Sequence, residues 1–207
     1  MTYAKRYAII LEFKNFKIFT ETPGGIMTKI IESNYIFCPY CSSRLTTLKI
    51  DGVQKKVCTY CNWTHHPSVG QASVGLIFRK NKVLLVKRNR EPHKNTWGFP
   101  AGFVEYGESP IDALKREIRQ EVGLIVKKAT FIKFIQSNED PRSPGHFLFF
   151  YWVTTQGKIK NNDPKENQEI AWFNIKNPPE IGWPSHKKLF QILQTKTGIT
   201  KIKRGKI

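Results

Sequence analysis

The sequence lacks any long apolar run. No stretch of the 207-residue chain approaches the length of roughly 20 uninterrupted apolar residues that a membrane-spanning helix needs. The best N-terminal run, YAIILEF, is followed at once by Lys14 and has no small-residue cleavage site. These absences argue against a membrane partner and against secretion, so we expect a cytoplasmic protein.

Acidic residues are also scarce. The chain has 16 Asp and Glu against 34 Lys and Arg, a formal net charge of +18. A basic surface attracts phosphate-bearing molecules and speeds their encounter, so the balance favours polyanionic ligands, with a lysine-rich solvated surface as the plain alternative. Residues 196–207 contain five of the basic residues and no acid. They are predicted to be a basic tail, either solvated or in contact with nucleic acid.

Cysteine is limited to four residues, and these come as two pairs, CPYC and CTYC. The pairs are Cys38 with Cys41 and Cys58 with Cys61, separated by sixteen residues. This CxxC-x16-CxxC spacing is typical of a structural zinc held by four thiolates. Two disulfides would need an oxidising compartment, and a redox CxxC would not occur in duplicate. We therefore predict a structural Zn²⁺ site.

The segment between the cysteine pairs predicts the shape of that module. Asp51-Gly52 is a hairpin turn dipeptide, and strand-like runs flank it. Two cysteine knuckles on one hairpin make a zinc ribbon, predicted over residues 34–66. His65 and His66 are interpreted as linker residues, because four sulfurs already complete a tetrahedral shell.

Residues 1–33 resemble nothing that follows and are predicted to be an N-terminal extension. Met27 is preceded by Gly24, Gly25 and Ile26. Two glycine codons and one further codon before ATG can encode a purine-rich ribosome-binding sequence, so we hypothesise that translation starts at Met27.

A second domain is predicted over residues 70–195. SVGLIF and KVLLVKR are β-branched runs joined by the polar turn RKNK, which indicates a hairpin, and ATFIKFI, HFLFFYWVTT and EIAWFN are further strand candidates. SPIDALKREIRQEVG and SHKKLFQILQ have helical periodicity. The predicted fold class is α+β.

The first of these helices has clear ends and two faces. Ser109 is a suitable N-cap before Pro110, and Gly123 suits a left-handed C-terminal cap, which predicts a helix of about thirteen residues. The buried stripe is predicted to be Ile111, Leu114, Ile118 and Val122.

Two glutamates of this helix stand one above the other. Glu117 and Glu121 are four residues apart, and such a like-charge pair costs an isolated helix roughly 0.2–0.5 kcal/mol. A divalent cation between the two carboxylates would turn this cost into a stabilisation. The alternative is that the two glutamates belong to a solvated acidic face of the helix. The preceding glycine-containing loop favours the cation, because Gly102 and hard oxygen ligands suit Mg²⁺ or Mn²⁺.

Residues 102–124 resemble the Nudix hydrolase signature. The pattern is Gly, five residues, Glu, seven residues, Arg-Glu, an aliphatic residue, any residue, Glu-Glu, any residue, Gly and an aliphatic residue. Matching positions are Gly102, Glu108, Arg116, Glu117, Ile118, Glu121, Gly123 and Leu124. Gln120 departs from it by replacing the first of the paired glutamates. A zinc ribbon in front is similar to the branch of the family that includes NADH pyrophosphatases.

The resemblance implies an α/β/α sandwich around a mixed sheet and a metal-assisted attack of water on a diphosphate. Glu117, Glu121, the Gly102 carbonyl and the Gln120 amide oxygen would hold Mg²⁺ (or Mn²⁺), and Glu108 and Arg116 would brace the loop.

Further roles are expected around this metal site. Glu121 is the first choice for the general base, with Glu166 and Glu169 as candidates on a later loop. Arg88 would meet phosphates, or else only contribute to the basic surface. Phe99 would stack on a base, or else belong to the core.

The substrate is expected to be a nucleoside diphosphate derivative such as ADP-ribose, NADH or FAD. The Ser-Gln-Pro-Trp type motif of NADH pyrophosphatases is not matched by QSNEDPRSPGHF here. The alternative function is a catalytically weakened protein that binds a nucleotide or RNA, motivated by Gln120 and the net charge. An RNA end and a homodimer are further expected partners.

Overall fold

The computed structural model describes residues 35–66 and 68–195. The predicted extension 1–33, with Met27, and the predicted tail 196–207 lie outside the described residues. The chain divides into two compact units, residues 1–67 and residues 68–207. Within the described part of the chain, no helix combines the length and the apolar character needed to cross a membrane.

The first unit is built on the hairpin that the sequence predicts. Strands β1 (Thr46–Ile50) and β2 (Val53–Val57) pair antiparallel. Asp51 (φ 52°) and Gly52 (φ 80°) join them, and two consecutive residues with positive φ match the twist of a tight hairpin turn.

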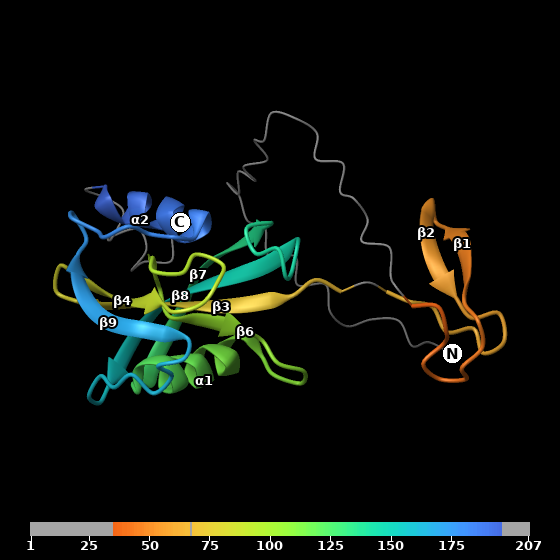
Figure 1. The fold of residues 1–207 in the computed structure, drawn as a ribbon, viewed down its shortest axis with the longest axis horizontal. Coiled ribbons are helices and arrows are strands. Elements are labelled where there is room, and N and C mark those ends of the chain that lie inside the picture. Colours follow the sequence, from red (N-terminus) through yellow and green to blue (C-terminus); the bar gives the residue numbers. More distant parts are fainter. Residues whose placement is uncertain (1–34, 67, 196–207) are drawn as a thin grey trace, which may run out of the picture. The chain divides into compact units, whose positions relative to one another are not determined.

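The second unit is a mixed sheet with one helix on each face (Figure 1). Its elements are β3 (Gln71–Arg79), β4 (Lys82–Arg88), β5 (Trp97–Gly98), β6 (Ala101–Phe103), α1 (Pro110–Val122), β7 (Ile125–Ser137), β8 (His146–Gln156), β9 (Asn167–Asn174) and α2 (Pro184–Gln194). The strand order is β5-β4-β3-β8-β7, with β6 also paired to β3 and β9 to β4. β3 and β8 are parallel, and the other strand pairs of the sheet are antiparallel.

Each face of the sheet carries its own core. Side chains alternate along β4, so that Val83 and Leu85 face the core under α2, whereas Leu84 and Val86 face the core over α1. The predicted α+β class and α/β/α sandwich are confirmed. A β3–β4 hairpin is present as the sequence indicates.

Helix α1 lies close to β3 because of a glycine. A Cβ atom at Gly75 would come 2.8 Å from Cδ1 of Ile118 and 3.3 Å from Cδ1 of Leu114. The Ser73 hydroxyl, also on β3, donates a hydrogen bond to the carbonyl of Pro110 at the start of the helix. Strand β3 thus fixes how closely α1 approaches the sheet and where the helix begins over it.

The ends of α1 are as predicted, but its buried stripe is not entirely so. The Ser109 side chain accepts from the backbone N–H of Asp112, and Gly123 has a left-handed φ of 72°. Ile111, expected in the core, is 37% exposed, because it lies in the first turn and the buried residues begin at Ala113. Glu121 is buried instead.

Candidate active site

The four cysteine sulfurs of the first unit converge on one point. All four lie within 4.8 Å of one another, and the shorter Sγ–Sγ distances are 3.4–3.6 Å. Zn–S bonds of about 2.3 Å in a tetrahedron place sulfurs about 3.8 Å apart, so the set fits one zinc ion. The cysteines are free rather than disulfide-bonded. The sulfur cluster is consistent with a zinc ribbon.

The pKa values of two of these thiols differ widely, so that all four sulfurs ionise together only when a cation is present. Hydrogen bonds from the side chain and backbone of Ser43 lower the pKa of Cys41 to about 6. The backbone of Trp63 lowers the pKa of Cys61, but burial and the neighbouring thiols outweigh it and raise that pKa to about 12. Four thiolates therefore need a positive charge among them, and a site closed by four sulfurs is structural.

In the second unit, Arg116 ties the loop before α1 to the helix. Its guanidinium donates to both carboxylate oxygens of Glu108 at 2.8 and 2.9 Å and to the carbonyl of Phe103 at 2.8 Å. It also donates to Oε1 of Glu117 at 2.6 Å. These bonds from Arg116 lower the pKa of Glu108. A bidentate pair of this kind orients the loop as well as attracting it.

Gly102 lies against the carboxylate of Glu117. A Cβ atom at this position would be 1.9 Å from Cδ of Glu117, so any side chain here would force the Glu117 carboxylate to move. Glycine thus allows the backbone and this carboxylate to approach closely. A backbone carbonyl beside a carboxylate is a suitable pair of hard oxygen donors for Mg²⁺.

Glu121 is a buried carboxyl group one turn further along α1. It is 5% exposed, and its oxygens accept from the Ala101 backbone N–H at 3.0 Å and from Asn167 at 3.4 Å. Burial raises the pKa of Glu121 well above its usual range, and the charges of Glu117 and Glu166 add to this. Burial raises the pKa of Glu117 as well. Two such carboxylates gain from a shared divalent cation, so the residues fit one.

A cleft of about 230 Å³ opens beside these carboxylates. Glu117, Glu121 and Gly102 line it together with three arginines: Arg88, Arg90 and Arg142. Carboxylates that suit a cation and guanidinium groups that suit phosphate oxygens therefore share one cleft.

Arg88 is the most buried of the three arginines. It is 9% exposed, and Glu166 accepts from Arg90 at 2.6 Å and lies 3.7 Å from Arg88. Nη2 of Arg88 is buried without a hydrogen-bond partner in the described structure. A buried unpaired N–H costs free energy, so this donor favours a ligand oxygen.

The NUDIX domain family model matches residues 69–193. The chain belongs to the Nudix family. Its predicted nature as a Nudix-type hydrolase acting on phosphoric anhydrides is thereby confirmed, and the family's use of a divalent metal agrees with the carboxylate pair.

Two groups of curated relatives are similar to this Nudix protein. The ADP-ribose pyrophosphatase of Methanocaldococcus jannaschii is 34% identical over 134 residues, which are 64% of this chain and 77% of that protein. The NAD-capped RNA hydrolase NudC of Pectobacterium carotovorum is 26% identical over 167 residues, which are 81% of this chain and 62% of that protein. The chain thus spans less than two thirds of that NudC protein.

Solved structures agree on the Nudix fold. A NUDIX hydrolase from Nitrosomonas europaea superposes with a TM-score of 0.61 at 21% identity, covering 78% of this chain and 92% of that one. The MutT NUDIX hydrolase from Burkholderia pseudomallei gives 0.56 at 22% identity, covering 60% and 98%.

The Nudix cleft brings together some of the predicted site residues and leaves others outside. Glu117, Glu121, Gly102, Arg88, Phe99 and Glu166 line it. Gln120 is exposed, does not line the cleft, and accepts from Arg116 at 3.0 Å. Glu169 is exposed on β9, where it pairs with Lys87. Neither outlying residue faces the cleft.

Phe99 lines the cleft and belongs to the core. It is 2% exposed, and its ring packs against Phe190 and His186 with centroids 5.7 and 5.2 Å away. Nδ1 of His186 accepts from the Phe99 backbone N–H at 3.2 Å. Burial lowers the pKa of His186 to about 3, so this imidazole is neutral.

Sequence reasoning missed the loop of residues 138–145 on the rim of the Nudix cleft. Asp140 is 3% exposed and holds Arg142 through three hydrogen bonds of 2.7–3.2 Å. Glu139 accepts from the backbone and hydroxyl of Ser185 at the start of α2. The only sequence signal was the acid-rich run NED before Pro141, and the partner of Glu139 in that run, Ser185, is 46 residues away along the chain.

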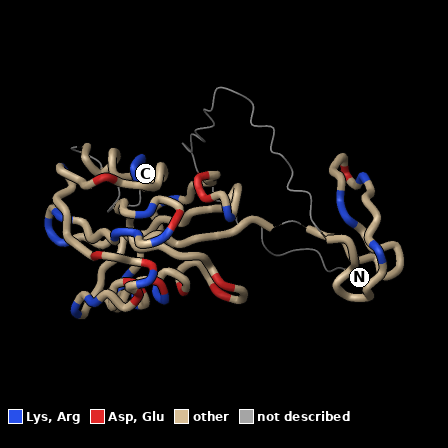
Figure 2. Tube along the Cα trace, in the orientation of Figure 1, with Lys and Arg blue, Asp and Glu red and all other residues tan. Residues whose placement is uncertain are grey.

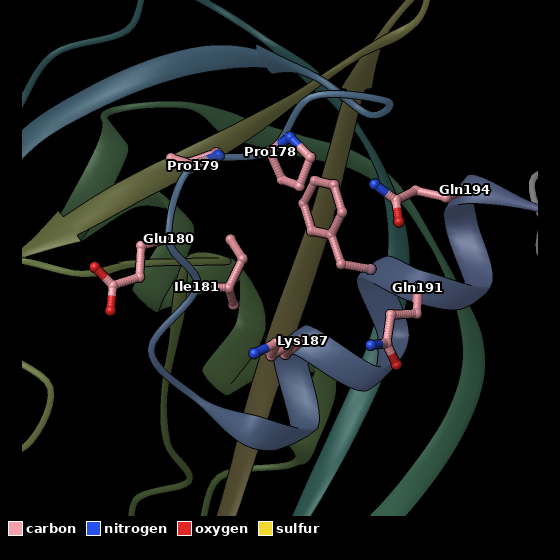
Figure 3. A pocket seen from close by; sticks show the side chains of 8 residues that line it. Pro178, Pro179, Glu180, Ile181, Lys187, Gln191 and Gln194 are labelled. Carbon is pink, nitrogen blue, oxygen red and sulfur yellow. The ribbon is translucent and has the colours of Figure 1, made fainter.

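A second hollow of about 460 Å³ lies between α2 and the segment before it (Figure 3). Its lining is Pro178, Pro179, Glu180, Ile181, Lys187, Phe190, Gln191 and Gln194. No residue of the Nudix signature reaches it, so we assign the chemistry to the smaller cleft.

Proposed function

We propose that this protein hydrolyses the diphosphate linkage of a nucleoside diphosphate derivative, with ADP-ribose as the first candidate and Mg²⁺ or Mn²⁺ as the cation. The observation that carries the proposal is the shared cleft, in which Glu117 and Glu121 accompany the three arginines. A diphosphate bridges these groups naturally, because its oxygens bind both a metal ion and guanidinium donors.

The chain's own residues have distinct roles in this proposal. Glu117, Glu121 and the Gly102 carbonyl would hold the cation, which when bound would supply positive charge to the diphosphate and make an attacking water more acidic. Arg116 keeps Glu117 in place through its 2.6 Å bond. Arg88 and Arg142 position the diphosphate oxygens.

Glu121 takes the proton from the attacking water, with Glu166 as the second candidate for this role. Glu166 is engaged by Arg88 and Arg90, which keeps its carboxylate charged and oriented. Addition of water across the P–O–P bridge of ADP-ribose then gives AMP and ribose 5-phosphate. The bond between one phosphorus and the bridging oxygen breaks, so the two products together contain all the oxygen atoms of ADP-ribose plus the one oxygen atom of water.

Two observations bear on the choice of substrate. The relative with 34% identity is named an ADP-ribose pyrophosphatase, which supports ADP-ribose. The NudC relatives align over 81% of this chain and are named NAD-capped RNA hydrolases, which supports a capped RNA end as the second candidate. The mismatch of QSNEDPRSPGHF to the NADH pyrophosphatase motif favours the first.

The position of Gln120 favours an enzyme over a pure binding protein. Because Gln120 is exposed and bonds to Arg116 outside the cleft, its neutral side chain removes no charge from the cleft lining.

The full chain should be incubated with Mg²⁺ or Mn²⁺ and with ADP-ribose, NADH, FAD and NAD-capped RNA, and monophosphate release measured by chromatography. We expect ADP-ribose turnover, and a loss of about 10²–10⁴-fold in kcat for Glu121→Gln. Glu169→Gln is the control outside the cleft and should retain activity. Binding of the panel without turnover of any member would instead identify a binding protein.

A further inference from the structure

The two cysteine knuckles of the ribbon are built alike, and each presents a tyrosine at the same position. In each knuckle the residue after the second cysteine has positive φ, Ser42 at 60° and Asn62 at 61°. Tyr40 and Tyr60 are 79% and 81% exposed. A tyrosine this exposed contributes little to the ribbon core, so its position calls for another explanation.

The surroundings of the two tyrosines differ. The Tyr40 ring lies 6.3 Å from that of Trp63, which in turn lies 6.1 Å from Tyr35 and 5.8 Å from His65. Trp63 is partly buried against the small core of Cys38, Leu45 and Cys58, which anchors these rings to the ribbon. We call Tyr35, Tyr40, Trp63 and His65 the aromatic row. Tyr60 makes no ring contact with the described residues.

The strand register places two lysines, Lys56 and Lys49, on the same face of the hairpin as the aromatic row. Val57 bridges to Thr64, and the His65 N–H donates to the Lys56 carbonyl at 2.8 Å, so His65 lies opposite Lys56. Opposite residues of an antiparallel pair point to the same face of a sheet.

Continuing across the hairpin, Lys56 pairs with Thr47 and Lys49 pairs with Gln54. Because Thr47 and Lys49 are two residues apart, all four point to one face. Lys55 pairs with Leu48 and points to the other face. Lys49 and Lys56 therefore continue the aromatic row, whereas Lys55 does not.

The ribbon has very little negative charge. Residues 35–66 contain four Lys and Arg and a single acid, Asp51, which lies in the hairpin turn. Figure 2 shows basic positions along the hairpin and the acidic residue at its tip. Rings interleaved with cations suit a polyanion that has exposed flat groups better than they suit an apolar protein partner.

We propose that this face of the ribbon binds single-stranded nucleic acid. Unpaired bases stack on Tyr40 and Trp63, and backbone phosphates meet Lys56 and Lys49. The proposal stands on the ribbon alone and does not depend on which diphosphate the Nudix cleft hydrolyses. Base stacking is tolerant of sequence, so we expect little preference among bases.

The test uses the full, zinc-containing chain and fluorescence anisotropy with labelled oligonucleotides of about 10 residues. The oligonucleotides carry a 5′-hydroxyl, so binding is measured without any diphosphate. Single-stranded RNA, single-stranded DNA and a duplex are the three probes. The chain supplies matched controls, since Tyr60→Ala mirrors Tyr40→Ala and Lys55→Gln mirrors Lys56→Gln. Unchanged zinc content and circular dichroism verify folding of each variant.

We expect Tyr40→Ala to weaken single-strand binding about 5- to 100-fold, and Tyr60→Ala to change it less than about twofold. Lys56→Gln should lower the slope of log affinity against log salt by about 0.7, and Lys55→Gln should leave that slope unchanged. A preference for RNA or DNA identifies the source of the strand, and either supports the proposal.

Three outcomes would overturn the proposal that this face of the ribbon binds single-stranded nucleic acid. Equal effects of Lys55→Gln and Lys56→Gln would mean that only overall charge matters. Duplex binding as tight as single-strand binding would exclude base stacking. Loss of dimers on sedimentation of Tyr40→Ala, without loss of binding, would make the aromatic row a contact between copies of the chain.

Discussion

The ribbon gathers four sulfur donors and the Nudix unit gathers two carboxylates beside a backbone carbonyl, and the two sets are arranged in opposite ways. In the ribbon, four sulfurs lie within 4.8 Å and leave no position for a further ligand. On α1, Glu117 and Glu121 border a cleft of about 230 Å³. Soft donors in a closed shell stabilise a fold, whereas hard donors beside open space can share a cation with a substrate. Donor type and access together therefore separate a structural metal site from a reactive one.

The largest effect that tests this comparison is expected when one of the four cysteines proposed to bind zinc is removed. We expect Cys58→Ser to unfold the ribbon, because structural zinc supplies about 10–16 kcal/mol of apparent free energy to small modules. Hydrogen exchange should show lost protection over residues 35–66 only, since the Nudix unit has its own two cores. Lost protection throughout residues 71–194 would contradict this separation.

The next effect concerns the close approach at Gly102. Gly102→Ala places a methyl group 1.9 Å from the Glu117 carboxylate carbon, so that the carboxylate must move. A displacement of about 1 Å at a reacting group costs about 100-fold in rate, and we expect kcat to fall by that order. Steady-state kinetics with ADP-ribose measure it.

Gly107→Ala is the matched control for that variant. Gly107 lies in the loop that joins β6, the strand of Gly102, to α1. It has a φ of 80°, and a Cβ atom added there would meet nothing within 4 Å, so alanine strains the backbone without touching Glu117. We expect Gly107→Ala to lower the melting temperature while retaining activity. Equal loss of kcat in both variants would mean that general loop strain, rather than the carboxylate, is responsible.

A smaller effect is the pH dependence of stability without Mg²⁺. The pKa of Glu121 is raised by burial and by Glu117, so protonation favours the folded state. That contribution is fully present below the unfolded pKa of about 4.3 and is lost as pH rises through the higher folded value. We expect wild-type melting temperature to fall over this window and Glu121→Gln to flatten the fall.

This measurement uses protein purified in the presence of Zn²⁺, with no added Mg²⁺. Each kcal/mol should appear as about 2–4 °C for a chain of this size. Adding Mg²⁺ at neutral pH should raise the wild-type melting temperature and leave that of Glu121→Gln nearly unchanged. Parallel pH curves for the two proteins would remove Glu121 as the titrating group.

The smallest effect is expected at the position that departs from the signature. Gln120→Glu restores the usual residue, but this side chain is exposed and bonds to Arg116. An exposed ion pair contributes about 0.2–1 kcal/mol, so we expect less than about fivefold change in kcat/KM. A gain of 100-fold would show that the glutamine weakens catalysis.

Local patterns in the sequence were enough to predict much of this fold. The limits of α1 follow from Ser109 and Gly123, and the hairpin of the ribbon follows from Asp51-Gly52, because each depends on neighbouring residues only. Ile111 shows the limit of periodicity, which marks a face of a helix but not how far the sheet beneath it extends.

The candidate site was less accessible to sequence reasoning. The signature residues could be predicted because they are fixed by spacing along one loop and one helix. The hydrogen bonds between Glu139 and Ser185 join residues that are 46 apart in the sequence. The ion pair of Arg88 with Glu166 forms only because β4 and β9 are adjacent in the sheet. Such contacts follow from tertiary packing, which no local pattern encodes.

Gly75 has a consequence for how this site could be tuned. It lies on β3 beneath α1, and a methyl group there would meet Ile118 and Leu114 from below. Since Glu117 and Glu121 ride on the same helix, any lift of α1 would move both away from Gly102 together. The distance of Glu117 and Glu121 from Gly102 thus depends on Gly75, an interior residue whose side chain is a single hydrogen atom.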